Sequence, residues 1–146
     1  NGVVDSYAQY SVFVNNGSYT TGGTGKVLGF FARADGSPTV DIFLTHTLTS
    51  TPGYKHICIY VNRNSHVMYV NGQSVATSTV DVTGRTYNIT NGGVRDFLVG
   101  AVRNTDNTTI LNAANFQIPL VKAYNRALTA SEVQRNFNAI RSRFGI

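Results

Sequence analysis

The sequence predicts an all-β domain of antiparallel strands that is closed by one C-terminal α-helix. Glycine and tyrosine are abundant, with 14 and 8 copies in 146 residues, and methionine occurs once. Together with many Thr, Val and Asn residues, this balance is typical of strands joined by tight turns. Alternating apolar runs are separated by turn residues at intervals of roughly ten positions. Apolar residues at helical spacing occur only near the end of the chain.

Size and composition indicate a single domain over residues 1–146, with strands over about 7–124 and a helix over about 130–143. Hydrophobic residues make up 42% of the chain and charged residues 13%, which provides a buried core and too little charge for a disordered tail. The chain opens at Asn1 with neither an initiator Met nor a charged-then-apolar leader. We therefore expect a processed product or part of a longer chain.

The first half of the chain reads as three strands. Tyr10–Val14 alternates and ends at the turn residues Asn15–Ser18, and the glycine-rich stretch Thr20–Gly25 is a loop. The strand resumes at Lys26–Ala34, and after the turn Asp35–Pro38 an alternating run follows, Val40–Thr47, which is ended by Thr51–Gly53.

The clearest local signal is a three-stranded meander over Tyr54–Val80. In its first strand, Tyr54–Asn62, the two-residue period places Ile57, Ile59 and Val61 on one face and Tyr54, His56, Cys58 and Tyr60 on the other. Arg63–Ser65 turns the chain into His66–Val70. Asn71–Gly72 then supplies the positive backbone angles of a type I′ turn, and Gln73–Val80 runs back.

Two more strands are expected before the helix. Asp96–Gly100 is short and apolar, Arg103–Thr109 is a polar loop, and Phe116–Tyr124 is the last strand. Pro119 has no amide donor, so this last strand must lie at an edge or carry a bulge.

The helix is specified at both ends. Thr129 and Glu132 form a capping box, and Leu128 can pack on Val133 as a hydrophobic staple. Apolar residues then line one face, and Gly145 can close the last turn. The apolar stripe consists of Val133, Phe137, Ile140 and Phe144.

Two stretches of sequence carry a resemblance to a known family. Gly53–Val61 (GYKHICIYV) and Val67–Ala76 (VMYVNGQSVA) resemble the central hairpin of laminin G-like and concanavalin A-like lectin domains. Phe97–Gly100, Phe116–Lys122 and Ala123–Val133 (AYNRALTASEV) are similar to the closing strands and helix start of the same family. The resemblance covers more than half of the chain and implies an antiparallel β-sandwich jelly roll with one C-terminal α-helix.

The last residues carry a softer resemblance that bears on function. Phe137–Ile146 (FNAIRSRFGI) is similar to the C-terminal endings of such domains in tailed-bacteriophage structural proteins. It implies a non-enzymatic virion protein at the virion surface, a capsid decoration or fibre component that can adhere to host-surface glycans. Its partners would be other virion proteins, copies of itself as a homo-oligomer, and host-surface polysaccharide. The alternative is a carbohydrate-binding module of a larger extracellular protein or glycoside hydrolase.

The chain departs from the family at two places. Pro119–Leu120 stands where an acidic residue is common, and the first strand, which normally pairs with the last, is weak or missing before Tyr7. The second departure favours a longer parent chain or a strand supplied by a neighbour.

Catalysis is not expected, because glycoside hydrolysis needs two carboxyl groups held roughly 5 to 10 Å apart. The seven acidic residues include no pair closer than six positions in the sequence, and the one glutamate, Glu132, already has a role in the capping box. A pair could still converge through folding. The acidic residues are Asp5, Asp35, Asp41, Asp81, Asp96, Asp106 and Glu132.

No cofactor is predicted. His56 and Cys58 share one face of a strand, but structural zinc needs four ligands, so with His46 and His66 in other elements we interpret them as ordinary strand residues. A thiol in the middle of an apolar strand is usually inert, which argues against Cys58 as a nucleophile. Calcium is the weaker alternative to no metal, because it is bound by carboxylates and loop carbonyls. Its candidate ligands are Asp35, Asp41, Asp96 and Asp106.

Glycan binding would need aromatic rings for the C–H faces of a sugar and amides or hydroxyls around them. The sequence has no Trp, so tyrosines would have to serve. The candidate rings are Tyr54, Tyr60, Tyr69 and Tyr87, and the candidate polar fringe is Asn91, Arg103, Asn104, Asp106 and Asn107.

Charge is concentrated in the C-terminal segment. From Lys122 onward, five basic residues are accompanied by one acidic residue, Glu132, and the whole chain carries a net charge of +5. Nucleic-acid binders spread basic and aromatic residues over a whole surface, so no nucleic-acid partner is expected. We interpret Arg135, Arg141 and Arg143 as a solvated face of the helix, with assembly contact to an acidic neighbour as the sharper alternative.

Two further classes are disfavoured. Cys58 is the single cysteine, which excludes an intramolecular disulfide and a multi-cysteine zinc site. No run approaches the roughly 18 to 20 consecutive apolar residues that cross a bilayer, so no membrane insertion is expected.

Overall fold

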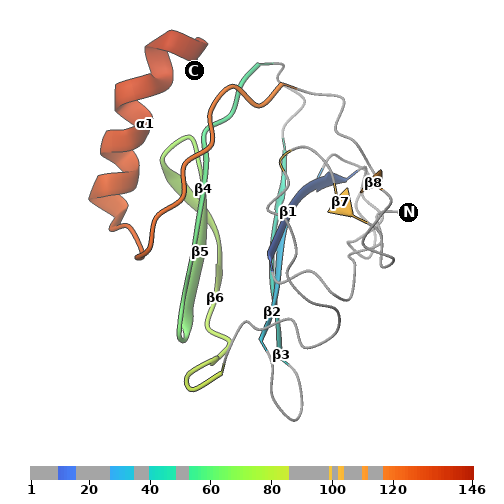
Figure 1. The fold of residues 1–146 in the computed structure, drawn as a ribbon. Helices are drawn as coiled ribbons and strands as arrows, with labels where there is room; N and C mark the ends of the chain where they lie inside the picture. Colours follow the sequence, from blue (N-terminus) through green and yellow to red (C-terminus); the bar gives the residue numbers. More distant parts are fainter. Residues whose placement is uncertain are drawn as a thin grey trace.

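The computed structural model describes residues 10–15, 27–34, 40–48, 53–85, 99, 102–103, 110–111 and 117–146. These residues form antiparallel strands followed by a C-terminal helix, α1 (Ala130–Phe144), which is the all-β class that the sequence predicts. Figure 1 shows three layers, with one sheet between the other sheet and the helix. Among the described residues, no helix is both long enough and apolar enough to cross a bilayer.

The first sheet has the order β1-β2-β3, formed by β1 (Tyr10–Asn15), β2 (Val27–Ala34) and β3 (Val40–Thr47). Neighbouring strands are antiparallel, and the register places Phe30 opposite both Val12 and Leu44. All three strands start within one residue of their predicted positions.

The second sheet is the predicted meander, in the order β4-β5-β6. It comprises β4 (Ile57–Asn62), β5 (Ser65–Val70) and β6 (Gln73–Ser78). The β5–β6 turn has φ +50° at Asn71 and +79° at Gly72, the positive values that a type I′ turn requires. Tyr54–His56 was predicted within β4 but precedes it.

The main core lies between the two sheets. Ile42 and Leu44 of β3 meet Met68 of β5, and none of the three is more than 1% exposed. Ile59 and Val61 of β4 pack against this cluster, so the face predicted for them is confirmed. Burial of these side chains is worth roughly 1.5 to 3 kcal/mol each relative to full exposure, so this interface contributes substantially to stability.

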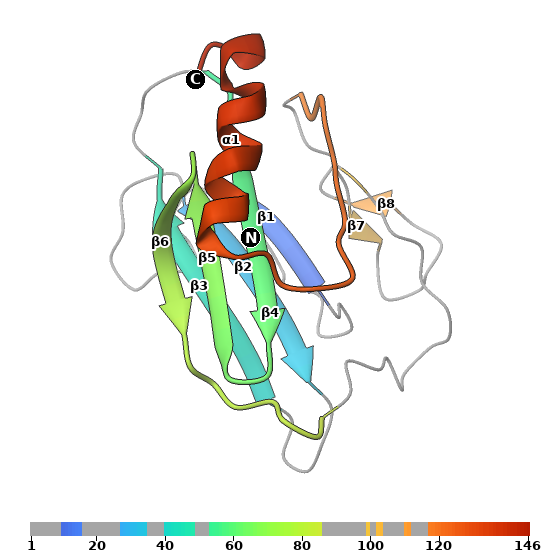
Figure 2. The ribbon, with the colours of Figure 1, turned by 90° about the vertical axis from the view of Figure 1, so that its left-hand side faces the viewer.

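The opposite face of the second sheet is covered by α1 (Figures 1 and 2). Val67 and Tyr69 of β5 form a second buried cluster with Leu128 and Val133. Cys58 and Tyr60 of β4 pack against this cluster, on the side that the two-residue period assigned to them. The second sheet is therefore covered on both faces, and the helix-side cluster contains no side chain that the structure describes in the first sheet.

The predicted helix signals are confirmed. The Thr129 hydroxyl accepts from the Glu132 amide at 3.2 Å, and Glu132 Oε2 accepts from the Thr129 amide at 2.9 Å. Leu128 and Val133 share one buried cluster, as a staple requires. At the other end, Gly145 takes φ +65° and its amide donates to the Arg141 carbonyl. The first four amides and the last four carbonyls of a helix have no hydrogen-bond partner within it. The caps supply partners at both ends and so define where the helix starts and stops.

The prediction of a last strand over Phe116–Tyr124 is wrong for the residues that the structure describes, 117–124. Residues 117–124 have no regular secondary structure and are exposed. Pro119 cannot donate to a ladder, and the ends of the segment bond side chains instead: the Tyr54 hydroxyl donates to Gln117, and Asn136 Nδ2 donates to the Tyr124 hydroxyl at 3.2 Å. Its apolar side chains remain 39 to 49% exposed, namely Ile118, Leu120, Val121 and Tyr124.

Two short strands lie in the stretch between the meander and this segment. β7 (Val102–Arg103) pairs antiparallel with β8 (Ile110–Leu111). Arg103 was predicted to open a loop but is the second residue of β7, and the rest of that loop lies outside the described residues. Of the predicted strand Asp96–Gly100, only Val99 is described, at a bend.

Candidate ligand-binding groove

Three of the four candidate tyrosines lie on the helix side of the second sheet. The Tyr54 ring tilts against Phe144 with centroids 5.4 Å apart. Tyr60 and Tyr69 have ring centroids 6.4 Å apart, and the Tyr60 hydroxyl lies 3.3 Å from Ser65 Oγ. Tyr69 is only 7% exposed. These rings therefore pack between sheet and helix and do not form an open aromatic platform.

Of the remaining candidates for glycan contact, the structure describes only Arg103. Arg103 lies in β7, opposite Ile110. The other five lie outside the described residues: Tyr87, Asn91, Asn104, Asp106 and Asn107.

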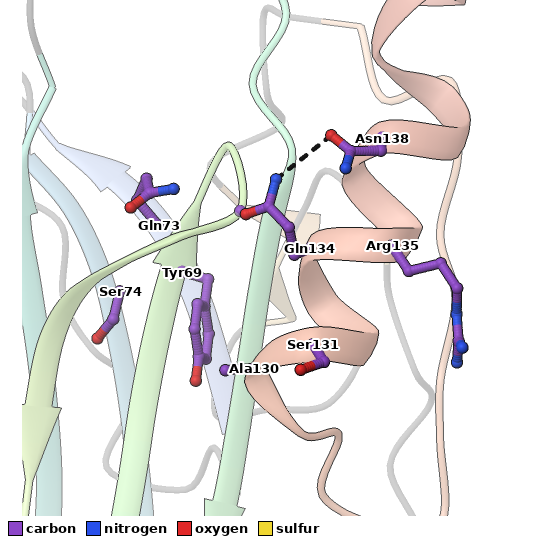
Figure 3. Close-up of a pocket in the computed structure, with 9 residues that line it drawn as sticks. Tyr69, Gln73, Ser74, Ala130, Ser131, Gln134, Arg135 and Asn138 are labelled. Carbon is purple, nitrogen blue, oxygen red and sulfur yellow. Dashed lines mark hydrogen bonds between the residues drawn. The ribbon is translucent and has the colours of Figure 1, made fainter.

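An open groove lies between the β5–β6 turn and the first turns of α1 (Figure 3). Its strand wall carries Tyr69, Gln73 and Ser74, and its helix wall carries Ser131, Gln134 and Asn138. Each of these side chains ends in an amide or a hydroxyl, which can both donate and accept hydrogen bonds. Gly72, Ala130 and Arg135 complete the lining.

The strand wall of the groove is held by Asn71. Its amide donates to the His56 carbonyl at 2.8 Å, and its side-chain Oδ1 accepts from the His56 amide at 2.9 Å. The turn residue thus ties the β5–β6 turn to the chain just before β4. One backbone bond and one side-chain bond of Asn71 therefore fix the position of the turn relative to the backbone of His56.

The helix wall approaches the turn at Gly72. A Cβ on this residue would lie 2.7 Å from Gln134 Oε1 and 3.0 Å from Phe137 Cδ1. Real Cβ atoms essentially never come within 3.0 Å of another heavy atom, so only glycine fits without movement of the helix side chains. Gly72 is therefore required twice, by its positive φ and by the contact with α1.

Polar groups on the helix wall are ordered by their neighbours. Gln134 Nε2 donates to Asn138 Oδ1 at 3.3 Å, one turn further along the helix (Figure 3). Arg135 belongs to the lining, but its side chain extends away from the strand wall (Figure 3). The functional groups that face each other across the groove are therefore uncharged.

Beneath the helix, burial sets the protonation of two side chains. Burial lowers the pKa of His56 below its ordinary value of 6.5, and the positive charge of Lys122 lowers it further. Burial also raises the pKa of the Cys58 thiol. A thiol with a raised pKa is a poor nucleophile near neutrality, which agrees with the packing role that the sequence predicts. The His56 ring instead lies 5.9 Å from the Phe137 ring.

Metal ligands do not converge in the part of the chain that the structure describes, where no group of three or more His, Cys, Asp or Glu side chains could hold an ion. Asp41 lies half-buried in β3. The other calcium candidates, Asp35, Asp96 and Asp106, lie outside the described residues. His66 is fully buried in β5, and its Nε2 donates to the Val80 carbonyl at 2.8 Å.

The three helix arginines do not share one face. At about 100° per residue, Arg141 and Arg143 flank the apolar stripe on opposite sides, and Arg135 points to the outer surface. Arg141 lies 5.8 Å from the Phe137 ring centroid, and Arg143 lies 5.6 Å from that of Phe144. All three side chains are exposed, and assembly contact through them stays a prediction.

The chain matches no family model, no curated protein and no solved structure. Its function therefore has to be argued from its own residues. Tyr69 is the one groove residue that the sequence predicted as a ligand contact. The Asn71–Gly72 turn was visible in the sequence, but the helix wall that faces it was not, because the two lie about sixty positions apart.

Proposed function

We propose that this chain is a concanavalin A-like, laminin G-like β-sandwich jelly roll that serves as a non-enzymatic structural protein of a tailed-bacteriophage virion. It acts at the virion surface as a capsid decoration or fibre component and adheres to host-surface glycans. Other virion proteins or further copies of the chain are its partners.

The observation that carries this proposal is the way the helix closes the second sheet. The segment that resembles the family's helix start, ending in the Thr129–Glu132 capping box, lies where Leu128 and Val133 cover β5. The hairpin that resembles the family's centre forms β4 to β6 and packs its other face on β3. The hairpin and the helix start thus meet in one layered arrangement, which supports the jelly-roll assignment, whereas residues 117–122 do not form the closing strand that the resemblance implies.

Two of the described carboxylates, Asp81 and Glu132, support a non-enzymatic role. A glycosidase acid needs a raised pKa to hold its proton near neutrality. Hydrogen bonds from Arg126 and Thr129 instead lower the pKa of Glu132 to about 2. Hydrogen bonds from Thr83 lower the pKa of Asp81. Both groups are therefore held as carboxylates.

An assembly role is supported by the exposed segment 117–124. Contiguous apolar surface on a folded domain commonly marks a protein contact. Here four large apolar side chains lie exposed within seven positions: Ile118, Leu120, Val121 and Tyr124.

The particle assignment is tested by electron microscopy of phage particles from the source host, labelled with an antibody raised against this chain. Regular labelling of capsids or fibres is expected. A glycan array on the isolated chain, with and without calcium, tests adhesion in parallel. Unlabelled particles together with binding to a defined sugar would favour the alternative, a carbohydrate-binding module of a larger extracellular protein.

A further inference from the structure

We propose that the groove between the β5–β6 turn and α1 binds an uncharged saccharide unit. This inference rests on the proposed glycan adhesion and deepens it by naming the site and the ligand class. The location of the site is taken from the groove lining, because the tyrosines selected from the sequence are largely used in packing.

The polar groups of the groove match the hydroxyls of a neutral sugar. Sugar hydroxyls donate and accept at once, and so do the groups on both walls. Ser74 and Gln73 are exposed on the strand wall, and Ser131 and Asn138 are exposed on the helix wall. All four belong to the lining of the groove, two on each wall (Figure 3).

The absence of charge among these groups selects against acidic sugars. Arg135 is the one charged residue of the lining, and its side chain extends away from the strand wall (Figure 3). Glu132, at the start of the same helix, is held by Arg126 with Nη2 to Oε1 at 2.6 Å. Neither charged side chain faces across the groove, so a carboxylated sugar would meet no fixed positive charge there.

Both walls are held in place before any ligand arrives. Asn71 anchors the turn through two hydrogen bonds to His56. Gly72 lies directly on the side chains of Gln134 and Phe137, and the capping box begins the helix. Little ordering is therefore required on binding, which reduces one of the main penalties of association.

Affinity at one groove should nevertheless be low. The groove is open, and Tyr69 offers an apolar patch of small area because its ring is 7% exposed. We expect dissociation constants on the order of millimolar for a single copy. Many copies on one particle would raise the effective affinity by roughly a hundredfold or more, provided that several grooves reach one glycan surface.

The test is a nuclear magnetic resonance titration of the ¹⁵N-labelled 146-residue chain. The probes are trisaccharides of glucose, mannose and N-acetylglucosamine, with trigalacturonate as the charged arm. At least one neutral probe should shift the side-chain amides of Gln73, Gln134 and Asn138 in a saturable way, and trigalacturonate should not.

Two variants locate the site. Asn138→Ala removes a groove amide and should weaken binding about five- to tenfold, the usual effect of losing one hydrogen bond. Ser131→Gln fills the groove from the helix wall and should abolish saturation. Asn136→Ala is the matched control, because it removes the same side chain from the same helix outside the groove lining. Its affinity should equal that of the parent chain.

Three results would overturn the inference: no neutral probe saturates at tens of millimolar, trigalacturonate binds best, or Asn136→Ala and Asn138→Ala weaken binding equally. Each of these three results can be distinguished from a failure of the proposed function. Unlabelled phage particles would contradict the virion assignment, whereas labelled particles with an unresponsive groove would leave that assignment intact and remove only the site.

Discussion

Asn71 bonds twice to the backbone of His56, once through its own amide at 2.8 Å and once through its side-chain oxygen at 2.9 Å. The residue that allows the chain to turn between β5 and β6 also attaches that turn to the segment that leads into β4. Turn formation and groove geometry therefore depend on the same side chain.

Substitution of Asn71 should separate these two roles. Asn71→Gly keeps the positive φ and loses the Oδ1 bond, so we expect a loss of about 1 kcal/mol in the free energy of unfolding. Asn71→Ala loses the same bond and keeps a Cβ at φ +50°, as the parent residue does, so it should be roughly 1 to 2 kcal/mol less stable than Asn71→Gly, which carries no Cβ. Urea denaturation followed by circular dichroism measures both. Equal stability of Asn71→Ala and the parent chain, which both carry a Cβ at this φ, would show that the side-chain bond contributes nothing.

Gly72 should be less tolerant of alanine than Gly84. Both have positive φ, +79° and +73°, but a Cβ on Gly84 would meet nothing within 4 Å. Gly84→Ala therefore reports the backbone penalty alone, about 1 kcal/mol, and Gly72→Ala adds the contact with α1, for a total of roughly 2 to 4 kcal/mol.

Thermal unfolding of the two glycine variants gives the comparison. Adding Gln134→Ala to Gly72→Ala should recover part of the loss, because Gln134 Oε1 is the nearest obstructing atom. If both glycine variants were destabilised equally, the close approach of helix and turn would be contradicted.

The start of α1 should weaken in acid. Arg126 and Thr129 lower the pKa of Glu132 from 4.5 to about 2, so the folded state binds this proton less readily than the unfolded state. The stabilisation is complete above pH 4.5 and is lost as the pH falls towards 2. Melting temperatures of the parent chain and Glu132→Gln should therefore converge across this window. The difference should also shrink at high salt, since the Arg126 pair is exposed.

His56 should make stability depend on pH near neutrality. Burial and then Lys122 lower its pKa below 6.5, so the unfolded state binds the proton more readily. Stability is complete above pH 6.5 and falls as the pH decreases from there towards the folded-state pKa. His56→Gln should flatten this slope, and Lys122→Gln should reduce it in part. Hydrogen exchange of α1 amides between pH 7.5 and 5 tests this, and an unchanged slope in His56→Gln would contradict it.

Local features of this protein were determined by the sequence alone. The capping box joins Thr129 to Glu132, three positions away, and the β5–β6 turn depends on two adjacent residues with positive φ. Alternation in β4 determined which side chains share a face. Such signals are readable because the interacting groups lie within a few positions, where backbone geometry dictates their relative placement.

Only the tertiary structure decided what those elements meet. The groove exists because α1 approaches a turn about sixty positions earlier in the chain. The Tyr54 hydroxyl is likewise hydrogen-bonded to Gln117, which lies 63 positions away. Residues 117–124 have a strand-like pattern but no ladder in the described structure, because Pro119 lacks a donor and the flanking side chains bond elsewhere. Periodicity assigns a face to each residue, but the partner of that face depends on how distant segments pack.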